Sequence, residues 1–110
     1  DTCAILANGM AGPVAEEEFG EALRAGCIRM AEMMARDGEG ATKLLRSKVD
    51  GAMDTRQART VAKAIINSPL IKTMAFGADP NVGRVLMAVG KCFDVDQDPQ
   101  LTRVWINDVE

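Results

Sequence analysis

The 110-residue chain contains neither histidine nor tyrosine, and only 4% of its residues are aromatic. Without an imidazole, a Ser-His-Asp triad and a histidine-ligated metal site are both excluded. The three cysteines (Cys3, Cys27 and Cys92) are widely spaced and form no C-x-x-C pair, so we expect small buried thiols and neither a disulfide framework nor a zinc site. Any chemistry must therefore use carboxylates, lysine, arginine, hydroxyls or backbone groups, and no metal is expected.

The chain also lacks an excess of basic residues, since its net charge is −3 and its pI is near 5.0. Nucleic acids and anionic membranes attract basic surfaces, so neither is an expected partner. No apolar run approaches the roughly 20 residues of a membrane-spanning helix. The first residues, DTCAILANGM, lack the basic region of a signal peptide. A cytoplasmic protein is expected.

What the chain does have is the composition of a folded domain, with 47% hydrophobic and 26% charged residues. Because domains commonly have roughly 100 to 150 residues, a single domain over residues 1–110 is expected. Apolar residues at spacings of three and four predict a helix over residues 15–36. A second helix begins with a capping box of Asp54 and Gln57 and stops at Asn67.

Four stretches have the apolar run or the alternation of β-strands. They are residues 3–7, 44–50, 70–76 and 102–108. In the last of them Val104 and Ile106 share one face. A third helix is predicted after the third strand, with Asp79 as its N-cap and Pro80 at its first position. The order β-α-β-α-β-α-β predicts an α+β fold, in which a mixed sheet has helices packed on one face.

Two motifs have features of ligand-binding loops without matching them. DVDQDP has the alternating acids of an EF-hand, but Pro99 and Trp105 stand where that loop needs glycine and glutamate, so a solvated acidic loop is favoured. GADPNVGR lacks the Gly-Lys-Ser/Thr ending of a phosphate-binding loop. A packing turn is the favoured interpretation, and a ligand site of Arg84 and free helix amides is the alternative.

The stretch ARDGEGATK ends the first predicted helix and places Glu39 between two glycines. It is no dinucleotide fingerprint, because a third glycine is missing and it follows a helix. From the residues alone, Glu39 is an exposed loop acid. The residues by themselves predict an α+β domain without an evident catalytic set.

Three longer stretches together resemble the ornithine acetyltransferase family, or bifunctional glutamate N-acetyltransferase family, of arginine biosynthesis. They are DTCAILANG, DGEGATKLLRSKVDGA, and INSPLIKTMAFGADPNVGR followed by MAVGKC. The resemblance covers nearly the entire chain. It implies the self-processing fold of that family, with this chain as an interior segment of the second, beta chain.

The resemblance implies transfer of acetyl from N-acetylornithine to glutamate, with acetyl-CoA as a donor in some members and no cofactor. In the family, self-cleavage exposes a threonine that carries the acetyl group. That threonine is expected upstream of Asp1, and a substrate-contacting segment beyond Glu110, so no catalytic residue is expected here. The implied partners are N-acetylornithine, ornithine, glutamate and the alpha chain of an alpha2-beta2 assembly. The alternatives are a self-processing amide hydrolase of similar fold and a non-catalytic subunit domain.

One residue receives a role from the resemblance. Glu39 corresponds to a substrate-contacting acid of the family, and we expect its carboxylate to bind the ammonium of ornithine or glutamate. Lys43, Asp79 and Arg84 lie in matching motifs, but packing and helix capping explain them without a catalytic role. Val82 stands where the family usually has tryptophan.

Overall fold

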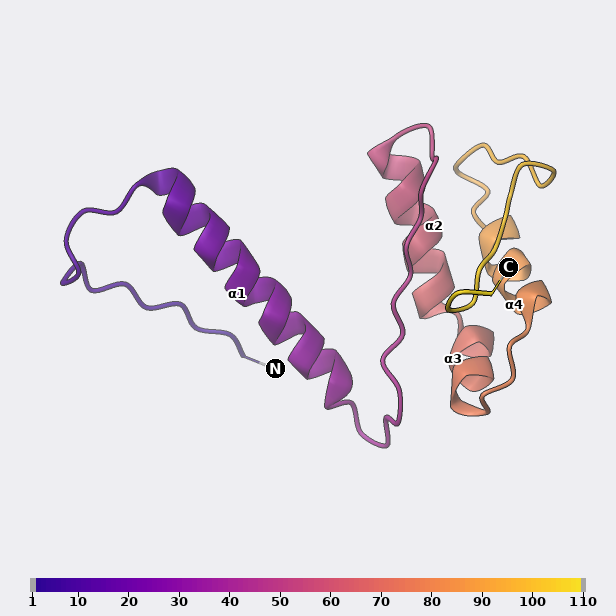
Figure 1. Cartoon of the computed structure of the whole chain (residues 1–110), viewed down its shortest axis with the longest axis horizontal. Coiled ribbons are helices and arrows are strands. Elements are labelled where there is room, and N and C mark those ends of the chain that lie inside the picture. The colour runs from indigo at the N-terminus through magenta and orange to yellow at the C-terminus, as the bar shows by residue number, and fades with distance from the viewer. Residues whose placement is uncertain (1, 110) are drawn as a thin grey trace. The chain divides into compact units, whose positions relative to one another are not determined.

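The computed structural model of the protein describes residues 2–109, in two units. The first unit ends at Ala41 and contains α1 (Glu16–Arg36). The second unit begins at Thr42. It contains α2 (Thr55–Asn67), α3 (Pro69–Phe76) and α4 (Val82–Gly90), which Figure 1 shows in chain order. The expectation of a single domain over residues 1–110 stays a prediction.

Helix α1 confirms the helix predicted over residues 15–36. Three glutamates lie in its first turn and Arg36 lies in its last, which places each charge at the helix end whose dipole it complements. The predicted apolar stripe is present, but no residue of α1 is buried: Phe19 is 47% exposed and Met34 is 53% exposed. Cys27, on the same stripe, is also exposed, contrary to expectation.

Helix α2 begins as its sequence predicts. The Asp54 side chain accepts a hydrogen bond of 2.7 Å from the backbone N–H of Gln57. The Gln57 side chain accepts one of 2.7 Å from the backbone N–H of Met53, one residue before the position usual for a capping box. Ser68 ends α2 and is also the N-cap of α3, so the two helices follow each other directly.

The strand predicted over residues 70–76 is wrong, because these residues form α3. Pro69 occupies the first helical position, where its missing N–H costs nothing. Ile71 and Met74, three residues apart, are buried at 3% and 8% exposure. A short, uninterrupted apolar run fits a buried strand and a buried helix equally well, so its period does not distinguish them.

Helix α3 closes with a Schellman motif. The backbone N–H of Ala78 donates to the Ala75 carbonyl at 3.2 Å, and that of Asp79 donates to the Met74 carbonyl at 3.1 Å. Ala78 has a φ of 52°, the left-handed conformation that glycine usually supplies at this position. The closing turn therefore carries a small strain at Ala78.

Asp79 is not the N-cap of the next helix, so that prediction is wrong. Since the Asp79 N–H closes α3, α4 begins only after Pro80, and Asn81 caps it. The Asn81 side chain accepts a hydrogen bond of 3.2 Å from the backbone N–H of Arg84. Among the apolar residues of this helix, Val85, Ala88 and Val89 are buried, whereas Val82 and Leu86 are exposed.

The other three predicted strands form no ladder among residues 2–109, where the one pairing is an isolated antiparallel bridge between Ile106 and Val109. The predicted alternation nevertheless appears in the burial: Leu45, Ser47 and Val49 are half-buried, whereas the charged residues between them are exposed. A strand is stable only where another strand satisfies its backbone groups. The expected sheet and its strand order are therefore not confirmed.

The core of the second unit is small and aliphatic, and α2, α3 and α4 surround it. Its buried members are Ile71, Met74, Val85, Ala88 and Val89. Half-buried side chains pack against them from α2 and from both ends of the unit; they are Leu45, Val61, Ile65, Val104 and Ile106. Figure 1 shows the C-terminal segment returning to these helices. In the part of the chain that is described, no helix is both long and apolar enough to cross a bilayer.

Candidate functional site

Glu39 lies at the corner of a tight turn directly after α1. The backbone N–H of Ala41 donates to the Gly38 carbonyl at 2.8 Å, and Gly40 has a φ of 71°. Glu39 itself does not have a positive φ, so residues 38–41 form a type II turn with Glu39 in its second position. The third position of this turn requires a positive φ, which explains the glycine at 40.

The Glu39 side chain is exposed and has no hydrogen bond or ion pair with any described residue. A free carboxylate at a turn corner accepts hydrogen bonds only, and it binds ammonium groups with charge-assisted bonds. This geometry matches the exposed loop acid that the residues alone predict. Its role in substrate binding stays a prediction.

Lys43, four residues after Glu39, binds the end of α3. Its Nζ donates to the Phe76 carbonyl oxygen at 3.2 Å. A lysine at this place satisfies a carbonyl that the helix leaves without an internal partner, and its charge opposes the negative end of the helix dipole. This role of Lys43 could not be predicted from the sequence, because 33 positions separate it from Phe76.

Arg84 connects the beginning of α4 to α3. Its Nη1 donates to the Leu70 carbonyl at 3.3 Å and to the Thr73 hydroxyl at 3.2 Å. The Thr73 hydroxyl in turn donates to the Leu70 carbonyl at 3.0 Å. Because these contacts engage the guanidinium within the fold, they favour the packing interpretation of GADPNVGR over a ligand site built on Arg84.

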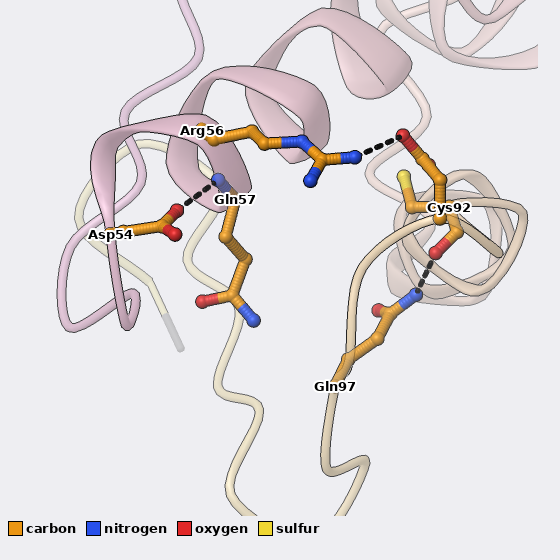
Figure 2. Close-up of polar contacts among 6 residues, drawn as sticks. Asp54, Arg56, Gln57, Cys92 and Gln97 are labelled. Atoms are coloured by element: carbon orange, nitrogen blue, oxygen red, sulfur yellow. Dashed lines mark hydrogen bonds and ion pairs between the residues drawn. The ribbon is translucent and has the colours of Figure 1, made fainter.

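The acidic loop of residues 94–99 is tied to the helices around it. Arg56 lies 4.0 Å from the Asp94 carboxylate, and the Gln57 side chain donates to the Asp96 carbonyl. Gln97 donates to the carbonyl oxygen of Val89 at 2.8 Å. It also donates to that of Cys92 at 3.3 Å (Figure 2). Residues 2–109 contain no group of three or more cysteine or acidic side chains arranged to hold a metal ion.

Cys92 is buried at the end of α4, with 4% of its surface exposed, as expected. Burial, and secondly the charge of Asp94, raise the pKa of the Cys92 thiol. Its Sγ donates to the Ala88 carbonyl at 3.8 Å. A neutral, buried thiol is a poor nucleophile, so Cys92 serves as a small core residue. Cys3 is exposed, contrary to the expected buried thiol, and, like the other two cysteines, it is free of any disulfide.

Comparison with known proteins places all of these segments in one family. The model of the ArgJ family matches residues 1–110. The "Arginine biosynthesis bifunctional protein ArgJ" of Rhodococcoides fascians is 56% identical over 111 residues, which cover 100% of this chain and 28% of the relative. The "Glutamate N-acetyltransferase Oat2" of Streptomyces clavuligerus is 47% identical with the same coverage.

The fold matches a solved structure as well. The crystal structure of arginine biosynthesis bifunctional protein ArgJ from Bacillus halodurans is similar with a TM-score of 0.74 and 39% sequence identity. The match covers 84% of this chain and 49% of the solved chain. The chain therefore spans about half of the solved chain, and 28% of the length of the curated relatives named above.

Proposed function

The chain belongs to the ArgJ family, and from this premise we propose that it is part of a glutamate N-acetyltransferase that moves acetyl from N-acetylornithine to glutamate. The observation that carries the proposal is the match of the family over residues 1–110, together with 56% identity to a relative that is named as an arginine-biosynthesis bifunctional protein. Acetyl-CoA is a second donor in this proposal, and no cofactor takes part.

The proposed reaction has two steps on one threonine hydroxyl, which lies outside these 110 residues. In the first step the threonine oxygen bonds to the acetyl carbon, the amide bond of N-acetylornithine breaks, and ornithine leaves with the hydroxyl proton. In the second step the amine nitrogen of glutamate bonds to the acetyl carbon, the ester C–O bond breaks, and a proton of the amine passes to the threonine oxygen, which restores the hydroxyl. Hydrogen-bond donors facing the oxyanion would stabilise both tetrahedral intermediates.

A mature enzyme of two kinds of chain is part of the proposal. All of this chain corresponds to 28% of the Rhodococcoides relative, whereas only 84% of it already corresponds to 49% of the solved Bacillus chain, so the solved chain is about half as long as that relative. This difference supports a precursor that is cut near its middle. In the proposed assembly the cut is autocatalytic, it releases the N-terminal threonine of the beta chain, and two alpha and two beta chains associate.

Glu39 is the proposed substrate contact of this chain. Its carboxylate accepts a hydrogen bond from the ammonium of the bound amino acid, and its place on a turn leaves both oxygens available. In N-acetylornithine the ammonium is on the side chain, separate from the acetylated nitrogen, so pairing it with a carboxylate holds the substrate at one position and orients the amide for attack. The single amine of glutamate pairs with Glu39 only as an ammonium, and it gives up a proton before it attacks. The absence of a competing partner among the described residues supports this role.

The proposal is tested on the complete protein with N-acetylornithine and glutamate. Formation of N-acetylglutamate in equal amount to ornithine is expected. In an assay with N-acetylornithine alone, acetate should not accumulate catalytically. Steady release of acetate without glutamate would instead identify an amide hydrolase. If neither N-acetylglutamate nor acetate forms, the result would favour a non-catalytic subunit domain.

A further inference from the structure

The C-terminal end of α1, where the chain leaves the helix in a turn (Figure 1), has carbonyl groups without a donor. The helix closes with one hydrogen bond of 3.0 Å, from the backbone N–H of Asp37 to the Met33 carbonyl. Among the residues that the structure describes, no donor binds the carbonyls of Met34, Ala35 and Arg36. In α3, by contrast, the last four carbonyls all accept hydrogen bonds. The end of α1 is therefore a group of open acceptors.

Negative charge gathers at this end of α1. The peptide dipoles of a helix sum to about half of a negative elementary charge at its C-terminus. Asp37 and Glu39 lie directly after the helix, and both are exposed. Arg36 is the basic residue of the last turn. The helix end therefore favours a cation, and a cation with several N–H donors can bind a carboxylate and a carbonyl at the same time.

Gly38 leaves one of these carbonyls accessible. A Cβ added at Gly38 would lie 3.7 Å from the Ala35 carbonyl oxygen and 3.5 Å from the Ala41 Cβ, which are ordinary contacts. Gly38 does not have a positive φ, unlike Gly40. Neither the backbone conformation nor crowding therefore requires glycine at position 38. An alanine methyl group there would, however, cover one side of the Ala35 carbonyl oxygen.

We propose that the Ala35 carbonyl and the Glu39 carboxylate together bind the side-chain ammonium of N-acetylornithine, and that Gly38 determines specificity by leaving this carbonyl open. The inference rests on the proposed function, in which Glu39 contacts the substrate. An ammonium has three N–H donors, so pairing with one carboxylate leaves a donor for the carbonyl. No described residue holds the Glu39 side chain elsewhere, so it is available at the helix end.

The complete enzyme tests this inference with two acetyl donors. N-acetylnorvaline has the carbon chain of N-acetylornithine without the ammonium, so the ratio of the two kcat/KM values measures recognition of the ammonium. We expect this ratio to fall about 3- to 10-fold in Gly38→Ala, because only N-acetylornithine loses a hydrogen bond. Inhibition by ornithine and by norvaline gives the same comparison for binding alone.

Stability separates this role of Gly38 from a structural one. Alanine restricts the unfolded chain, so the melting temperature of Gly38→Ala should be equal to that of the wild type or higher. Gly20→Ala is the matched control on α1, since a Cβ at Gly20 meets no atom within 4 Å. The ratio of the two kcat/KM values in this control should equal that of the wild type.

Two results would overturn the inference while the proposed function stands. One is an active wild type that uses both donors equally well, because the ammonium is then not recognised. The other is an unchanged ratio in Gly38→Ala, whether kcat/KM stays the same for both donors or falls equally for both. Failure of the proposed function is read in the wild type itself: absence of acetyl transfer from N-acetylornithine would overturn that function, and this inference with it.

Discussion

The Nζ of Lys43 lies 3.2 Å from the carbonyl oxygen of Phe76, and this bond completes the hydrogen bonding at the end of α3. The backbone N–H groups of the following turn satisfy the other three terminal carbonyls, which belong to Thr73, Met74 and Ala75. Only the Phe76 carbonyl depends on a distant part of the sequence. Lys43 thus joins the beginning of the second unit to a helix of that unit's core.

Replacing Lys43 with methionine should lower the free energy of unfolding by about 0.5–1.5 kcal/mol, the usual contribution of one partly exposed hydrogen bond. The change removes the donor and its favourable charge at the helix end while it keeps the aliphatic stem. Urea unfolding of the full-length protein measures the difference. Lys43→Arg keeps a hydrogen-bond donor, so its free energy of unfolding should fall less than that of Lys43→Met. Equal losses of stability in the two variants would contradict the role of this bond.

Replacing Ala78 with glycine should raise the free energy of unfolding by about 0.5–1 kcal/mol, because it relieves the strain of a φ of 52°. Ala75→Gly is the matched control, since Ala75 lies inside α3. There the same change should lower the free energy of unfolding by about 1 kcal/mol. Thermal unfolding compares the two variants, and a loss of stability in both would show that Ala78 is unstrained.

Replacing Asp54 with alanine should lower the free energy of unfolding by about 1 kcal/mol, because the variant leaves the backbone N–H of Gln57 without its side-chain acceptor. Asp50→Ala is the control, since the Asp50 carboxylate makes an exposed ion pair of 2.8 Å with Lys48. Exposed pairs contribute little, so that control should remain within about 0.5 kcal/mol of the wild type. Circular dichroism during urea unfolding follows both, and similar losses would mean that Asp54 does not act as a cap.

The raised pKa of the Cys92 thiol predicts a loss of stability at alkaline pH. The unfolded thiol ionises at its ordinary pKa of about 8.5, whereas the folded thiol still holds its proton. The contribution of the Cys92 thiol to the free energy of unfolding is therefore complete below pH values near the ordinary thiol pKa. It falls as the pH rises above that pKa. The loss of stability at alkaline pH should be smaller in Cys92→Ala.

Iodoacetamide at pH 8.5 should label Cys3 and Cys27 before Cys92. Simultaneous labelling of all three cysteines would contradict the burial of Cys92.

The sequence predicts the long elements of this fold better than the short ones. Helices α1 and α2 were predictable because periodic apolar residues and end signals agree over 21 and 13 residues. Helix α3 was not, since an eight-residue apolar segment has no readable period. Asp79 and Asn81 are both good caps, and only the hydrogen bond that closes α3 decides between them.

In the candidate site, the sequence predicts features that depend on neighbouring residues better than contacts between distant segments. The two glycines around Glu39 predict an exposed acid on a turn, because the constraint is local. The contacts of Lys43 with Phe76 and of Arg84 with Leu70 could not be predicted, since they join segments that only the folded chain brings together. The segments at residues 44–50 and 102–106, which form no ladder within residues 2–109, kept their predicted alternation because burial depends on side chains, whereas a ladder needs a second strand.

The most direct test of the proposed function is the kinetics of Glu39→Gln in the complete enzyme, with Glu21→Gln on exposed α1 as control. The substitution keeps the shape of the side chain and removes its charge, so kcat/KM for N-acetylornithine and glutamate should fall about 10- to 100-fold, as loss of a charge-assisted hydrogen bond predicts. The control should match the wild type. Unchanged KM and kcat for both substrates in Glu39→Gln would contradict the assignment.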